Sequence, residues 1–134
     1  MQLCTFQLGG MWFGIDARLV QEVLRRQELT PVPLAPSHVA GLLNIRGQIV
    51  TALRLNERMG LDAQTSDPLH VVVRTGQEAV SLLVDAIGGV VDVTPEEFEQ
   101  VPPTTPATLR PLLSGSYKLP DRLVLVPDIE TAVA

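Results

Sequence analysis

The sequence predicts an all-β fold, and three observations support this fold class. Short apolar segments alternate with turn signals along the whole chain of 134 residues. The turns are supplied by 10 glycines and 11 prolines. Hydrophobic residues make up 46% of the chain but aromatic residues only 4%, so the core must be aliphatic. Many short strands with close turns are typical of small barrels and sandwiches.

The N-terminal segment predicts a β-hairpin followed by a helix. Residues 2–8 alternate between two faces, Gly9-Gly10 supplies a two-residue turn, and residues 11–15 form the returning strand. Asp16 stands where a helix N-cap is expected. Apolar side chains then recur at spacings of three and four, which predicts a helix over 17–24 with a stripe formed by Leu19, Val20, Val23 and Leu24.

The central stretch, residues 41–55, predicts a strand, a turn at Arg46-Gly47 and a second strand. Arg46 is unusual there, because turns ordinarily use Asn, Asp or Ser. Gly41, which opens a buried strand, indicates a bend or a close approach by another backbone. We expect the core to include seven aliphatic residues: Leu42, Ile45, Ile49, Leu53, Val72, Leu82 and Val84.

The second half continues the pattern of short strands, so residues 1–134 are expected to form one domain, or two small lobes that share a core. Gly88-Gly89 is expected to form a bulge that lets its strand curl. Thr94 is expected to cap a short helical turn, and Pro127 to start a short C-terminal helix. The expected strands are 70–74, 79–85, 87–93, 112–117 and 122–126, with one helical turn at 55–59.

Composition excludes several classes of function. The net charge is −5 and no Lys/Arg cluster is present, which disfavours nucleic acid as a partner. No apolar run approaches the ~20 residues that a membrane helix needs, so direct membrane insertion is not expected. Cys4 is the only cysteine and cannot form an internal disulfide, which favours a reducing compartment and a cytoplasmic location.

Residues suited to catalysis are sparse. His38 and His70 are the only histidines and have no metal-ligand spacing, so neither a metal site nor a cofactor is expected. Ser81 and Asp85 lie four apart on one strand, but no base is near them in the sequence. A binding module is therefore favoured over an enzyme, and a small β-barrel enzyme remains a minor alternative.

Two charged residues stand out as candidates for an interaction surface. Glu22 and Arg46 are 24 residues apart, and they would pair if their elements packed side by side. Equally, each side chain could simply be solvated, since an exposed ion pair contributes only ~0–1 kcal/mol to stability. From pattern alone, the aliphatic residues around Gly41 and Val90 are best interpreted as core.

Two blocks of sequence then carry a resemblance to a known family. The first half contains Phe13-Gly14-Ile15-Asp16, Val20-Gln21-Glu22-Val23, and a Pro33-x-x-Pro36 segment that leads into Gly41–Val50 with Asn44-Ile45-Arg46-Gly47. The second contains Leu83-Val84-Asp85 through Val90, a Pro102-Pro103 loop and Asp121–Val126. In this order and separation, they resemble CheW-like domains, the family of bacterial chemotaxis coupling proteins, over essentially the whole chain.

The resemblance implies two five-stranded β-barrel lobes that share an apolar core, and no catalytic activity. It implies an adaptor that joins the cytoplasmic tip of methyl-accepting chemoreceptors to the regulatory domain of a CheA-type histidine kinase within membrane receptor arrays. The matching partner-binding positions are Val20, Glu22, Gly41, Arg46 and Val90, with Glu22 and Arg46 as a pair important for assembly.

Departures from the family pattern suggest a particular kind of pathway. Thr51 stands where Pro is usual, and Arg54-Leu55-Asn56 stands where Asp-Leu-Arg is usual. By analogy, these exchanges suggest a dedicated or alternative chemosensory system, such as one for surface motility or pili. The main alternative is a CheW-like regulatory domain cut from a histidine kinase, against which the start at Met1 and the absence of linker sequence weigh.

Overall fold

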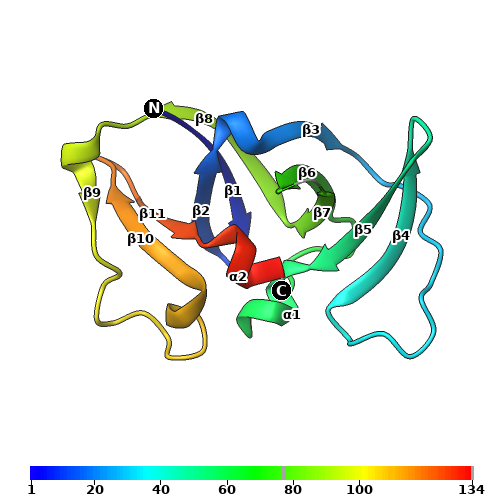
Figure 1. The fold of residues 1–134 in the computed structure, drawn as a ribbon. Helices are drawn as coiled ribbons and strands as arrows, with labels where there is room; N and C mark the ends of the chain where they lie inside the picture. Colours follow the sequence, from blue (N-terminus) through cyan, green and yellow to red (C-terminus); the bar gives the residue numbers. More distant parts are fainter. Residues whose placement is uncertain (77, 134) are drawn as a thin grey trace.

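The computed structural model describes residues 1–76 and 78–133, and most of them belong to two β-sheets (Figure 1). Sheet A has six strands in the order β8-β1-β2-β11-β10-β9, and sheet B has five in the order β3-β6-β7-β5-β4. Sheet A is built from β1 (Gln2–Leu8), β2 (Met11–Asp16), β8 (Ala86–Asp92), β9 (Phe98–Glu99), β10 (Leu113–Lys118) and β11 (Leu123–Pro127). Sheet B is built from β3 (Val20–Leu24), β4 (Val39–Ile45), β5 (Gln48–Arg54), β6 (Leu69–Thr75) and β7 (Glu78–Val84).

Helical segments are short and lie between or after the strands. They are η1 (Ala17–Leu19), α1 (Leu55–Met59), η2 (Pro95–Glu97), η3 (Arg110–Leu112) and α2 (Ile129–Val133). Within residues 1–76 and 78–133, no helix has the length and apolar character needed to cross a membrane. The all-β prediction is confirmed, with one sheet of five strands and one that gains a sixth through the two-residue β9.

The local turn chemistry explains why the predicted hairpins form. Gly9 and Gly10 have φ values of +57° and +79°, which a two-residue turn between β1 and β2 requires and glycine adopts without strain. Thr94 and Glu97 form the reciprocal capping box that starts η2. The register of β1 against β8 shifts opposite Gly88, which confirms the predicted bulge.

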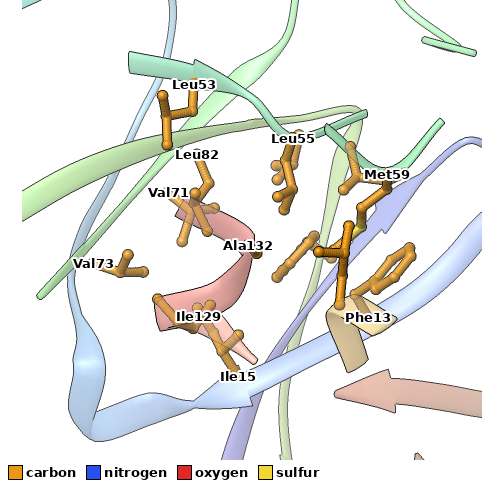
Figure 2. Close-up of a cluster of buried hydrophobic side chains, with 14 of the residues drawn as sticks. Phe13, Ile15, Leu53, Leu55, Met59, Val71, Val73, Leu82, Ile129 and Ala132 are labelled. Carbon is orange, nitrogen blue, oxygen red and sulfur yellow. The ribbon is translucent and has the colours of Figure 1, made fainter. Parts of the chain in front are cut away.

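The two sheets share one apolar core (Figure 2). Sheet A contributes Phe13 and Ile15 from β2, and sheet B contributes side chains such as Leu53 and Leu82. Two short helices, α1 and α2, also place side chains in this cluster. Figure 2 labels the members Phe13, Ile15, Leu53, Leu55, Met59, Val71, Val73, Leu82, Ile129 and Ala132. The shared core that the sequence led us to expect is therefore present.

The predicted helix over 17–24 is wrong beyond Leu19. Asp16 does cap a helical turn, because its carboxylate accepts from the backbone N–H of Arg18 at 3.0 Å, but this turn ends after three residues. The chain then continues as β3, which pairs with β6. A spacing of three and four in so short a segment does not distinguish a helix from a strand. The pairing with β6 makes this segment a strand instead of a helix.

The predicted core is right for four of its seven members. Leu53, Val72, Leu82 and Val84 are buried. Leu42 and Ile45 are only half-buried, and Ile49 is 62% exposed, so its assignment to the core is wrong. The pairing of β5 with β7 begins only at Thr51, so Ile49 lies where the two strands are not paired, and its side chain is exposed.

The C-terminal helix also starts later than predicted. Pro127 is the last residue of β11, where it pairs with Leu113, and α2 begins at Ile129. The carboxylate of Asp128 accepts from the N–H of Thr131 at 3.4 Å and the carbonyl of Asp128 from Ala132 at 2.8 Å. Asp128 is therefore the residue that starts the helix.

Candidate partner-binding surface

An ion pair between Arg46 and Glu22 is the central feature of the candidate surface. The Nη1 and Nη2 atoms of Arg46 donate to the Oε2 and Oε1 atoms of Glu22 at 2.5 and 2.9 Å. Two parallel bonds of this kind fix the guanidinium plane as well as its position. The Glu22 carboxylate raises the pKa of Arg46, first by hydrogen bonding and then by charge, so the guanidinium stays charged.

The hairpin between β4 and β5 sets the position of Arg46. Arg46 and Gly47 have φ values of +51° and +84°, as a two-residue turn of this hairpin needs. The side chain of Asn44 accepts from the N–H of Gly47 at 2.8 Å and steadies the turn. The Arg46 side chain is 76% exposed and that of Glu22 19%, so the carboxylate anchors a guanidinium that remains open to a partner.

The ion pair joins the two opposite edges of sheet B. Glu22 lies on β3, the first strand in the order of the sheet, and Arg46 lies next to β4, the last strand. A second connection runs nearby, where Thr30 and Leu42 exchange backbone hydrogen bonds of 2.8 Å in each direction. The two connections thus link the β3 side of sheet B to its β4 side.

The remaining predicted site residues are found in different surroundings. Val20 is half-buried and packs against the shared core, on the opposite face of β3 from Glu22, because the register of β3 against β6 shifts between these two residues. Val90, on the outer strand β8 of sheet A, is 57% exposed. Gly41 is buried on β4, so it cannot offer a side-chain-sized contact to a partner. The structure therefore brings Glu22 and Arg46 together, but it directs Val20 toward the core, leaves Val90 on the other sheet and places Gly41 beneath the surface.

A shallow groove of about 760 Å³ lies between β4 and the segment that follows β3. It is lined by Arg26, Gln27, Glu28, Thr30, Leu42, Leu43, Asn44 and Ile49. The exposed side chain of Ile49 therefore borders a depression at the same hairpin that carries Arg46. Charged and apolar side chains that meet in this way suit contact with another protein.

The structure also brings together two residues that sequence reasoning left apart. His70 on β6 and Ser81 on β7 are buried, and the Nδ1 atom of His70 lies 2.7 Å from the hydroxyl of Ser81. Burial lowers the pKa of His70. Asp85, the expected companion of Ser81, instead accepts from the N–H of Gly9 at 2.9 Å. The signal that could have found the pair is the hairpin register, which sets β6 against β7.

The described residues show no clustering of three or more His, Cys, Asp or Glu side chains suited to hold a metal ion. The side chains that do converge at the surface are an anchored arginine, its carboxylate partner and aliphatic residues. Together with the two-lobed β fold, this arrangement defines a protein-interaction module.

The chain belongs to the CheW-like domain family, whose model matches residues 2–134. Members of this family are non-catalytic scaffold and adaptor proteins, in agreement with the prediction that the chain is not an enzyme. The chain is 31% identical over 107 residues to the chemotaxis protein CheW of Treponema pallidum, which covers 75% of this chain and 63% of that protein. It is 29% identical to the CheW of Klebsiella aerogenes, over 96% of this chain and 79% of the relative.

A further relative and a solved structure complete the comparison. The chain is 26% identical to the protein PilI of Pseudomonas aeruginosa, over 84% of this chain and 64% of that protein. The structure of the CheW scaffolding protein from Thermoanaerobacter tengcongensis superposes with a TM-score of 0.89. That comparison covers 99% of this chain and 87% of the other at 24% sequence identity, and it supports the fold.

Proposed function

We propose that this chain is an adaptor of a bacterial chemosensory system that couples chemoreceptor signalling tips to a CheA-type histidine kinase and helps to build the receptor array. The observation that carries the proposal is the match of the CheW-like family over residues 2–134, combined with the ion pair that holds Arg46 at the surface. Its place of action would be the cytoplasmic face of membrane receptor clusters.

The geometry gives Arg46 a physical role in such an adaptor. Two hydrogen bonds already hold the guanidinium before a partner binds, so it loses little further conformational freedom when the partner covers it. This reduces the entropic cost of binding. Its planar fork offers donors in fixed directions, and its aliphatic stem offers apolar surface.

Binding to two purified partners tests the proposal. The full chain is titrated against a receptor cytoplasmic hairpin that contains the signalling tip and, separately, against the regulatory domain of the CheA-type kinase from the same genome. We expect both to bind, and we expect the chain to form a ternary complex with them. Failure to bind either partner under conditions in which both are folded would contradict the proposal.

The kind of pathway is a further part of the proposal. By analogy, the exchanges at Thr51, Arg54 and Asn56 suggest a dedicated system rather than general chemotaxis. A deletion strain examined for both swimming and surface motility separates these possibilities, because a dedicated system predicts a defect confined to one behaviour.

One alternative is that the chain is the regulatory domain of a kinase. Such a domain would share the fold class and the candidate surface, so neither of these two features decides against this alternative. The open reading frame decides directly, because a regulatory domain would continue from kinase sequence. An adaptor would bind a separate kinase domain in trans, as in the binding experiment above.

A further inference from the structure

Within residues 1–76 and 78–133, the chain crosses between the two sheets at two points (Figure 1). The first crossing is η1, which lies between β2 of sheet A and β3 of sheet B. The second is a single residue, Asp85, because β7 of sheet B ends at Val84 and β8 of sheet A begins at Ala86. This crossing belongs to one of the two sequence blocks that carry the family resemblance, but the Arg46 surface does not use it.

Asp85 holds the turn between β1 and β2 through its backbone and its side chain. Its N–H donates to the carbonyl of Gln7 at 2.9 Å, and its Oδ2 atom accepts from the N–H of Gly9 at 2.9 Å. A carboxylate that accepts from a backbone N–H makes a stronger hydrogen bond than a neutral acceptor does. Asp85 therefore ties the end of β7, in sheet B, to the first turn of sheet A.

The same turn is contacted from sheet B by Leu61. A Cβ atom built on Gly9 would lie 2.9 Å from the Cβ atom of Leu61, so the glycine packs directly against this leucine. Asn56 of α1, the helix that follows β5, holds Leu61 in place. Its carbonyl accepts from the N–H of Leu61 at 2.8 Å, and its Nδ2 atom donates to the Leu61 carbonyl at 3.3 Å. The contacts of Gly9 with Asp85 and Leu61 are called the sheet junction below.

The sheet junction supplies what the shared core lacks, namely direction. Burial of apolar surface holds the two sheets together, but this attraction depends on area and has no preferred angle. Hydrogen bonds weaken steeply when their geometry changes, so the bond between Asp85 and Gly9 favours one orientation of the sheets.

Two of the candidate partner-binding residues lie just after the two crossings. Glu22 follows η1 on β3, and Val90 follows Asp85 on β8, each within five residues of its crossing. Glu22 in turn holds Arg46 through two hydrogen bonds. The placement of Val90 relative to this ion pair therefore depends on how the two sheets are oriented.

We propose that Asp85 is a positioning residue for partner binding. By holding the β1–β2 turn through Gly9, it sets the orientation of sheet A relative to sheet B, and with it the placement of Val90 relative to the Arg46–Glu22 pair. A partner that contacts both sheets then meets a surface that already has its bound shape, which lowers the cost of binding. This inference rests on the proposed adaptor function and deepens it, because it names a residue that prepares the surface without contacting the partner.

Distances between two spin labels test the effect of Asp85 on orientation. Gln48→Cys on β5 and Lys118→Cys on β10 place one label on each sheet at exposed positions, while the native Cys4 is buried. We expect one narrow distance distribution in the otherwise wild-type chain. Asp85→Ala should broaden or shift it, whereas Asp85→Asn should retain it, because the amide oxygen of asparagine can still accept from the N–H of Gly9.

Binding to the receptor tip and to the kinase regulatory domain tests the functional part, in the chain without labels. Asp85→Ala should weaken binding to at least one of these partners by about fivefold, and Asp85→Asn should stay within about twofold of the wild type. Ser116→Ala is the control, because it removes a side-chain hydrogen bond to the carbonyl of Gln100 that lies wholly on the side of sheet A. It should leave binding to both partners unchanged, even if it lowers the melting temperature.

A pair of glycine variants tests the sheet junction from the side of the turn. Gly9→Ala and Gly10→Ala both place alanine at a positive φ, +57° and +79° respectively. Only the Cβ atom added at Gly9 meets Leu61, since no atom lies within 4 Å of the one added at Gly10. We expect Gly9→Ala to change the distance distribution and to weaken binding, and Gly10→Ala to change neither. This pair keeps the test decisive if Asp85→Ala fails to fold.

Three results would overturn the proposal. The first is a distance distribution that stays the same in Asp85→Ala and in Gly9→Ala. The second is a changed distribution with unchanged binding to both partners, which would make the sheet junction purely structural. The third is an equal loss of binding in Asp85→Ala and Ser116→Ala, which would reflect stability alone. Failure of the proposed function is distinguishable, because the wild-type chain would then bind neither partner while the label distances still report on the sheet junction.

Discussion

A Cβ atom built on Gly41 would lie 2.7 Å from the backbone carbonyl oxygen of Thr30, so the two backbones pack in direct contact. The resemblance to CheW-like domains pointed to Gly41 as a partner-binding position, but the residue is buried. The absence of a Cβ at Gly41 lets the backbone of Thr30 approach β4, where Thr30 and Leu42 form an isolated bridge.

Gly41→Ala is expected to destabilise the protein by about 2 kcal/mol or more, because it adds a clash with Thr30 to the strain of a φ of +151°. Thermal melts measure this loss. Hydrogen exchange at the amides of Thr30 and Leu42 should also accelerate.

Gly47→Ala is the matched control, since its φ of +84° imposes strain but no atom lies within 4 Å of the added Cβ. It should cost only about 1 kcal/mol. Equal losses in the two variants would mean that the contact with Thr30 has no energetic role.

Leu53→Ala should destabilise the protein by about 2–5 kcal/mol, because Leu53 belongs to the core shared by the two sheets (Figure 2). Ile49→Ala, on the same strand, should change stability by no more than about 0.5 kcal/mol, since Ile49 is exposed. Denaturant titration of both variants measures the difference. An unchanged midpoint for Leu53→Ala would remove that residue from the core.

His70 makes stability depend on pH. Burial lowers its pKa in the folded protein, so the folded state disfavours the charged imidazole. The full contribution is present above the ordinary histidine pKa of about 6.5 and is lost as the pH falls below that value toward the folded pKa. Urea midpoints should therefore decrease between about pH 7 and 5.5.

His70→Asn should flatten that decrease, because asparagine does not titrate and can still bond to Ser81. His38→Gln, at the other histidine, is the control and should retain the wild-type profile. A decrease that persists unchanged in His70→Asn would assign the dependence to other groups.

The parts of the fold that follow local rules could be predicted from the sequence. Gly9-Gly10 and Arg46-Gly47 specify their hairpins because two-residue turns demand positive φ values. Thr94 likewise acts through Glu97, a neighbour in the chain, with which it forms the capping box. These signals need no knowledge of the tertiary structure.

The features that could not be predicted depend on pairing between distant strands. The segment 20–24 has a spacing compatible with a helix, and only β6 makes it a strand. Ile49 is exposed because the pairing of β5 with β7 begins only at Thr51. The pair Glu22–Arg46 requires the strand order of sheet B, in which β3 and β4 are the two edges, and no local pattern contains that order.

The role proposed for Arg46 depends on its pairing with Glu22. Arg46→Ala and Glu22→Ala should each weaken binding to a receptor tip or to a kinase regulatory domain by a larger factor than they weaken the fold. Arg46→Ala leaves Glu22 without its partner, and Glu22→Ala leaves the guanidinium mobile. Thermal melts of the same variants provide the control for folding.

The double-mutant cycle of Glu22→Ala and Arg46→Ala, measured by binding to the receptor tip, tests this pairing most directly. If the pair acts as one unit, the double variant should bind about as weakly as either single variant, so the two effects will be less than additive. Strictly additive losses would contradict the pairing, and unchanged binding in both single variants would show that Arg46 is a solvated turn residue without a role in binding.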